Sequence, residues 1–196
     1  MVRTMSIFGT ASLLCGCVSL AAGQSVSKPD PHIRMFDPQL TAALTLGTRM
    51  SPTLDRLVEE IEHSDLIVYV MFERARQRAV AAHVGFMTAA GGRRYVHVAL
   101  DPALQGPNLI GMLAHELQHA AEIARAPSVV DERSLAALYL RIGVDCARNW
   151  LERRFDSAAA IEVGARVTRD ARDGFRQLAG TGVGSGAGTG CNDVCR

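Results

Sequence analysis

The sequence predicts an α+β protein in which a small sheet packs against several helices. Residues 66–72 are rich in Ile, Val, Tyr and Phe, the composition of a buried strand, and 80–88 and 94–100 follow as two further candidate strands. Apolar residues at helical spacing lie on both sides of this block. We therefore expect a mainly antiparallel or mixed three-stranded sheet with helices packed on it.

Turn and cap residues locate the elements before and within the sheet. Residues 24–50 are expected to form a linker and a short helix that begins at Asp37-Pro38 and ends at Gly47. Ser51-Pro52 has the pattern of a second helix start, with Ser51 as the N-cap. Gly91-Gly92 lies between the second and third strand segments and predicts a hairpin.

Three helices are expected after the sheet. Apolar periodicity predicts helices over about 106–125 and 131–143, and a last helix that begins near Asp156 or Ser157. The globular domain is expected to span 51–178. The remaining residues, 179–196, are rich in Gly, Ser and Thr and are expected to form a flexible tail.

The first 23 residues have the pattern of a signal peptide. Arg3 supplies a positive start, residues 6–20 are small and apolar, and residues 21–23 offer a cleavage site. The apolar run is shorter than the roughly 20 residues that span a bilayer. We therefore expect export to the periplasm or beyond. In the alternative, a lipid on Cys17 anchors the chain to a membrane, and we expect no membrane attachment without that lipid.

Composition and charge exclude some classes of partner. A net charge of +1, with 48% hydrophobic and 21% charged residues, is typical of a globular protein. The sequence has no basic stripe with interleaved aromatic residues, so we expect no nucleic-acid partner. Cys146, Cys191 and Cys195 follow the expected cleavage point, and their disulfide pairing is left open because three thiols cannot all pair within one chain.

The main functional signal is the motif H-E-x-x-H at His115, Glu116 and His119. On a helix the two histidines lie one turn apart on one face, which is the spacing that binds one metal ion. Glu116 lies about 100° round the helix, where its carboxylate can take a proton from a water on that metal. Apolar residues occupy the opposite face, so the pattern predicts a buried helix that carries a zinc site.

A catalytic zinc needs a third protein ligand, and four acids compete for that place. Glu122 shares the histidine face but lies about 4.5 Å beyond His119 along the helix axis, so a contact to a histidine or a salt bridge suits it as well. Glu162 points away from the buried stripe of its helix, and Glu132 is a further alternative. Asp156 begins the face of the last helix that packs inward. It is expected to be either the third ligand or a plain helix cap.

In three stretches the chain resembles the H-E-x-x-H zincin metallopeptidases of the gluzincin kind, and also a family of small, exported, uncharacterised bacterial proteins. The stretches are Ser51–Val70, His115–Ile123 and Phe155–Ala159, and together they span most of residues 51–167. In gluzincins a glutamate on a following helix completes the zinc site. The family pattern in the last stretch is Phe-Glu-Thr-x-Ala-Ala, so Asp156 stands where that glutamate would be, with a side chain one methylene shorter.

The resemblance implies a zincin-like fold and zinc-assisted hydrolysis of a peptide or protein substrate. Zinc would be held by His115, His119 and Asp156, and Glu116 would be the general base. An edge strand would bind the extended substrate, with 94–100 as the candidate by order, and Tyr139 is a candidate to stabilise the oxyanion or a core residue.

Two other functions stay open at this point. The chain can be an exported binding or scaffold protein that keeps a zincin-like fold without catalysis, or a zinc-free protein in which the histidines are incidental. Activity lost in Glu116→Gln while zinc stays bound would distinguish the enzyme from the binding protein.

Overall fold

The computed structural model describes residues 30–74, 81–145 and 155–181. The chain divides into two units, 1–30 and 31–196, and every described helix and strand belongs to the second. The predicted signal peptide, Cys17, the three later cysteines and the last part of the predicted tail lie outside the described residues. None of the described helices has the length and hydropathy that a membrane span needs.

The α+β prediction is confirmed, but the sheet has four strands rather than three. Its order is β1-β2-β4-β3, with bounds β1 Ile33–Met35, β2 Leu66–Phe72, β3 Ala82–Ala90 and β4 Arg93–Leu100. The pairs β1–β2 and β2–β4 are parallel and β3–β4 is antiparallel, so the sheet is mixed. The additional strand β1 lies in the polar, proline-containing stretch that was expected to be a linker.

The hairpin at Gly91-Gly92 is confirmed. Both glycines have positive φ angles, 59° and 73°, which suit the two-residue turn between β3 and β4. The predicted edge strand is wrong, because β4 lies between β2 and β3 while β3 is at an edge of the sheet. Strands joined by a tight hairpin pair with each other, so the pairing of β3 with β4 is local. The parallel pairing of β4 with β2, which removes β4 from the edge, depends on the whole fold.

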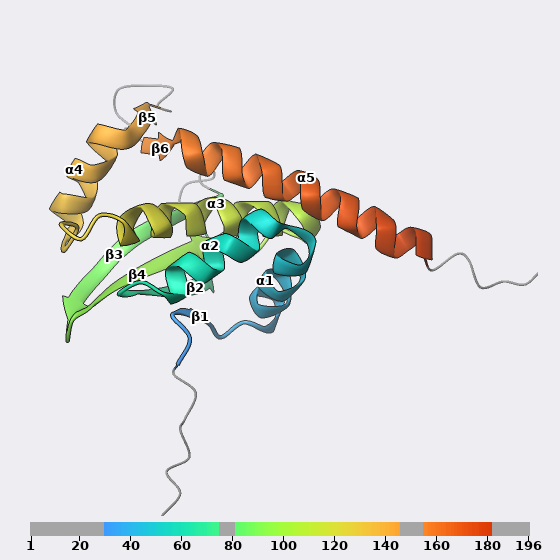
Figure 1. The fold of residues 1–196 in the computed structure, drawn as a ribbon, viewed down its shortest axis with the longest axis horizontal. Coiled ribbons are helices and arrows are strands. Elements are labelled where there is room, and N and C mark those ends of the chain that lie inside the picture. The colour runs from blue at the N-terminus through green and yellow to red at the C-terminus, as the bar shows by residue number, and fades with distance from the viewer. Residues whose placement is uncertain (1–29, 75–80, 146–154, 182–196) are drawn as a thin grey trace, which may run out of the picture. The chain divides into compact units, whose positions relative to one another are not determined.

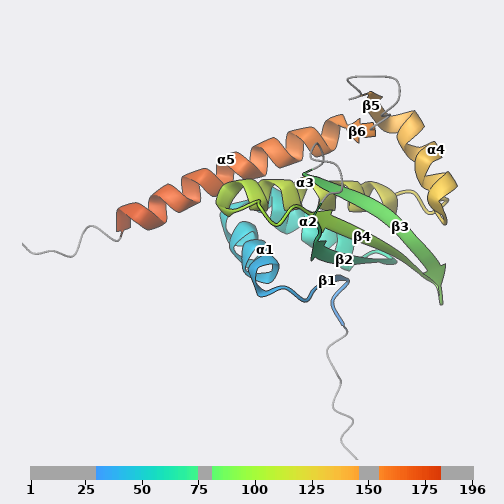
Figure 2. The ribbon, with the colours of Figure 1, turned by 180° about the vertical axis from the view of Figure 1, so that it is seen from behind.

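Helices cover one face of the sheet in two layers (Figure 1). Helix α3, Gly106–Ala124, contacts β2, β3 and β4, and α5, Ala158–Thr181, crosses α3 on the side away from the sheet. The view from behind shows the same order of layers (Figure 2). Helices α1, Pro38–Met50, and α2, Pro52–Glu62, pack against α3 and α5, while α4, Glu132–Ile142, leads into a two-stranded sheet of β5, Gly143–Asp145, and β6, Phe155–Ser157.

Two glycines allow close packing rather than marking helix ends. The predicted end of α1 at Gly47 is wrong, because the helix continues to Met50. A Cβ at Gly47 would lie 2.7 Å from Leu54 and 2.8 Å from Ile110, so glycine is needed for contact with α2 and α3. Gly111 of α3 has the same role against α5, since its Cβ would lie 1.8 Å from the hydroxyl of Thr168.

Arg94 of β4 fixes the C-terminal end of α3. The residue is 4% exposed, and its guanidinium donates hydrogen bonds to the carbonyl oxygens of Ile123 (2.8 Å), Ala124 (3.0 Å) and Ala126 (2.8 Å). It also forms a two-point ion pair with Asp65, at 2.7 and 2.8 Å. A cation at this end of a helix satisfies the last carbonyls and interacts favourably with the helix dipole.

Candidate metal centre

The two histidines of the motif come from the middle of α3, and Asp156 comes from β6. The ligand atoms of His115, His119 and Asp156 all lie within 4.8 Å of one another. Oδ1 of Asp156 lies 3.3 Å from Nε2 of His115 and 3.3 Å from Nε2 of His119. The structure thus brings together the three side chains that the sequence predicts as ligands, and this group can bind a metal ion.

The two separations between Asp156 and the histidines fit the edge of a small tetrahedral site. Zinc binds imidazole nitrogen and carboxylate oxygen at about 2.0–2.2 Å, so ligand atoms at two corners of a tetrahedron are about 3.3–3.5 Å apart. Both Asp156 separations, 3.3 Å, match this edge length. Two imidazoles and one carboxylate are also a donor set that suits zinc and other first-row transition metals better than calcium or magnesium.

Asp156 reaches the histidines from a strand rather than from a helix. The last helix begins at Ala158, and Asp156 precedes it in β6, paired with Val144 of β5. Its Oδ1 also accepts a hydrogen bond from the backbone N–H of Ser157 at 2.7 Å. The shorter aspartate side chain thus reaches the histidines from the strand directly before α5, the helix that packs along α3.

Glu122 holds His119 from behind. Its Oε2 lies 3.0 Å from Nδ1 of His119, and because an ionised carboxylate only accepts, that nitrogen carries the proton. Nε2 of His119 is then the nitrogen that can bind a metal. Glu122 is thus outside the group of possible ligands and is the hydrogen-bond partner of one of them, the arrangement that commonly fixes the tautomer of metal-binding histidines.

Ser157 and Tyr139 hold Glu122 in turn. The hydroxyl of Ser157 donates to Oε1 of Glu122 at 2.5 Å and accepts the N–H of Ala160 at 3.0 Å, so it also caps α5. The Tyr139 hydroxyl donates to Oε2 of Glu122 at 3.4 Å, and its ring lies edge-on to His119. Because the hydroxyl of Tyr139 is directed at Glu122, on the Nδ1 side of His119, the geometry does not support its predicted role at an oxyanion.

The other predicted acids lie away from the group. Glu132 is exposed in the first turn of α4, and Glu162 is exposed on α5, where it pairs with Arg166 at 2.7 Å. Neither residue belongs to the cluster of possible ligands. The contact of Ser157 with Glu122 could not be predicted, because it joins residues 35 positions apart in the chain. A serine directly before a helical stretch is, however, recognisable as a helix cap.

Glu116 is buried beside the group. It is 4% exposed, and its Oε2 has no hydrogen-bond partner among the described residues. Burial raises the pKa of Glu116 to about 7, with His119 opposing and Asp156 adding to the increase. A buried carboxylate oxygen without a partner is costly, so its presence here indicates a site for a polar group that completes the centre.

The histidines differ in their electrostatic surroundings. Burial lowers the pKa of His115, which favours the neutral form that binds metal. Burial also acts to lower the pKa of His119, but the hydrogen bond to Glu122 and the neighbouring carboxylates outweigh it and raise the value. The pKa of Glu122 is lowered, since its bonds to His119 and Ser157 outweigh its own burial, so it is ionised.

Comparisons of the chain with protein-family models, with curated proteins and with solved structures found no match. A functional assignment therefore rests on the residues of the site.

Proposed function

We propose that this protein is a zinc-dependent peptidase. His115, His119 and Asp156 would hold the zinc, and Glu116 would act as the general base. The observation that carries the proposal is the position of Asp156, which meets Nε2 of both histidines at the tetrahedral spacing beside the buried, unpartnered carboxylate of Glu116.

The roles of the protein groups follow from their surroundings. When bound, zinc supplies Lewis-acid activation of a water molecule and of a peptide carbonyl. Glu116 takes a proton at Oε2 and passes it to the departing amine, and its burial beside the three ligands, which raises its pKa, favours uptake of that proton. Glu122 and Ser157 keep His119 oriented throughout, because neither has to move for the proton transfer.

The edge strand β3 supports a peptide as the substrate. It pairs with β4 on one side and contacts α3, and residues 87–90 of its second half are exposed. An extended peptide that adds to such an edge gains main-chain hydrogen bonds whatever its sequence. We place the substrate chain along β3, in place of the strand at 94–100 that the sequence favoured.

Export is part of the proposal and rests on residues 1–23, which lie outside the described residues. The mass of the mature protein distinguishes its two forms. Cleavage after residue 23 supports a free exported protein, whereas a chain that begins at a diacylated Cys17 supports the lipid anchor.

The decisive experiment compares the wild type with Glu116→Gln, after both have been loaded with zinc and analysed for metal content. A peptide mixture incubated with each is followed by mass spectrometry. We expect equal zinc and a loss of at least about 100-fold in kcat/KM for the variant, the usual contribution of a general base. Glu162→Gln, an exposed acid on α5, is the matched control and should cleave as the wild type does.

Other outcomes assign the protein differently. A wild type that binds zinc and cleaves nothing would favour the binding or scaffold protein, in which the metal has a structural role. No zinc above background, in protein purified without a histidine tag, would contradict the metal site itself.

A further inference from the structure

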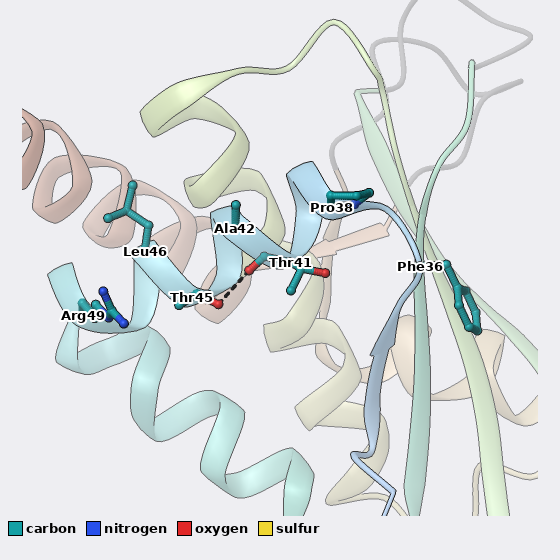
Figure 3. A pocket seen from close by; sticks show the side chains of 7 residues that line it. All are labelled: Phe36, Pro38, Thr41, Ala42, Thr45, Leu46 and Arg49. Carbon is teal, nitrogen blue, oxygen red and sulfur yellow. Dashed lines mark hydrogen bonds between the residues drawn. The ribbon is translucent and has the colours of Figure 1, made fainter.

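Two hollows in the described surface differ in what their walls offer. One lies over α1 and is lined by Phe36, Pro38, Thr41, Ala42, Thr45, Leu46 and Arg49 (Figure 3). Its wall contains no histidine and no carboxylate, and both of its threonine hydroxyls donate to backbone carbonyls, Thr41 to Asp37 at 3.1 Å and Thr45 to Thr41 at 2.8 Å. Nothing in its wall connects it with the metal centre.

The other hollow lies between α3 and α5 and includes a predicted metal ligand in its wall. It has a volume of about 410 Å³. The lining residues are Leu104, Asn108, Gly111, Met112, His115, Ile161, Gly164, Ala165 and Thr168. His115 thus belongs both to the group of possible metal ligands and to the wall of this cavity, which we call the His115 cavity.

Small residues create the cavity. Gly111 and Gly164 let α3 and α5 come together, since a Cβ on Gly164 would lie 3.0 Å from Cβ of His115 and 3.3 Å from the Gly111 carbonyl. Ala165 leaves room on the α5 side. Met112 and Ile161 also line the cavity, and Ile161 is 45% exposed although it is a large apolar residue.

The wall is mostly apolar, and besides His115 its polar side chains are Thr168 and Asn108, each with an oxygen that already has a partner. The hydroxyl of Thr168 donates to the carbonyl of Gly164 at 2.7 Å, and the side-chain oxygen of Asn108 accepts from Arg172 at 3.3 Å. No carboxylate or guanidinium belongs to the lining. A charged or strongly polar group would lose its hydration here without gaining a partner, whereas an apolar group is stabilised by burial.

We propose that the His115 cavity binds an apolar side chain of the substrate, of the size of leucine or larger, on a residue next to the bond that is cleaved. The proposal rests on the function proposed above and adds a substrate preference to it. Its volume is within the range of about 300–1,000 Å³ that is usual for ligand sites, so one large side chain fits.

The test measures binding to the zinc-loaded protein, so that it does not depend on catalysis. Two hydroxamates that differ only in an isobutyl group or a hydrogen beside the chelating group are titrated by calorimetry. Full burial of an isobutyl group should make the first bind about tenfold more tightly or better. In Ala165→Leu the new side chain fills the cavity from an exposed helix position, so the ratio should fall below about threefold.

Arg169→Leu adds the same side chain one turn along α5, outside the lining, and should keep the wild-type ratio. Circular dichroism and the melting temperature show that each variant is folded. Equal affinities of the two hydroxamates for the wild type, or binding of neither, would overturn the proposal. A preference that persists in folded Ala165→Leu would overturn the assignment to this cavity.

The two proposals fail in different ways. If the isobutyl preference is found but no peptide is cleaved, the cavity stands and the peptidase does not. If peptides are cleaved, those cut beside leucine, methionine or phenylalanine should dominate in the wild type and lose that advantage in Ala165→Leu. Cleavage without any such preference would leave the peptidase and refute the cavity.

Discussion

Replacing Glu122 by glutamine tests whether this carboxylate tunes the metal site through His119. The change keeps the size of the side chain and removes its charge, so packing around Ser157 and Tyr139 is preserved. The contacts that it affects include 3.0 Å to Nδ1 of His119, 2.5 Å to the hydroxyl of Ser157 and 3.4 Å to that of Tyr139.

The size of the effect follows from these contacts. A neutral amide accepts from Nδ1 of His119 more weakly than a carboxylate does, so the ring is a poorer ligand and less firmly oriented. Loss of such a partner lowers metal affinity by about 10- to 100-fold, which is about 1.4–2.8 kcal/mol of binding free energy. Competition with a coloured zinc chelator measures this affinity directly.

Two comparisons make the result specific. Glu162→Gln removes an equivalent charge from the exposed side of α5 and should leave zinc affinity unchanged. Ser157→Asp keeps a good helix cap but sets a second negative charge against Glu122, so it should weaken zinc while α5 stays folded. A zinc affinity of Glu122→Gln within threefold of the wild type would refute the reasoning.

Three further predictions concern the frame that holds the site. Gly111→Ala should lower the free energy of unfolding by about 2 kcal/mol or more, because the new Cβ would lie 1.8 Å from the Thr168 hydroxyl. The control Gly180→Ala has no atom within 4 Å of the new Cβ and should raise the stability slightly. Urea unfolding that gives equal stabilities for the two variants would contradict the close crossing of α3 and α5. Arg94→Met should cost about 3 kcal/mol in the same assay, since it leaves helix carbonyls and a carboxylate without their cation, and a loss under 1 kcal/mol would show that water replaces them. The hydrogen bond from Arg94 lowers the pKa of Asp65 below its ordinary 3.8, so the contribution of Asp65 to stability is present above pH 3.8 and is lost as the pH falls through the folded-state pKa. The difference in unfolding free energy between the wild type and Asp65→Asn should therefore shrink below pH 3.8. A difference that widens there would refute the sign.

Local patterns in the sequence predicted most of the helices and the core of the site. The spacing of His115 and His119 is a property of one helix, so it could be predicted without knowledge of the rest of the fold. The helix start at residue 131 and the hairpin at Gly91-Gly92 are local in the same way, and the structure confirms both.

Features that depend on contacts between distant segments could not be predicted in the same way. Strand β1 is three residues long and forms only by parallel pairing with β2, and the stretch around it carries prolines that suggested a linker. The choice between Asp156 and Glu122 also needed the fold. Both acids reach the histidines, but one reaches the Nε2 atoms and the other Nδ1, and helix geometry alone does not decide which.

The close crossing at Gly111 and Gly164, with Asp156 and Ser157 adjacent in the chain, also defines a signature by which relatives could be found. It consists of Gly-x3-His-Glu-x2-His-x2-Glu, followed later by Asp-Ser-x6-Gly, at residues 111–122 and 156–164. Each fixed position has its own reason: room for a neighbouring helix, a donor atom, a proton acceptor or a support for one of these. Such a pattern is much rarer by chance than the five-residue motif, and distant homologues that share the site should keep it where the rest of the sequence has diverged.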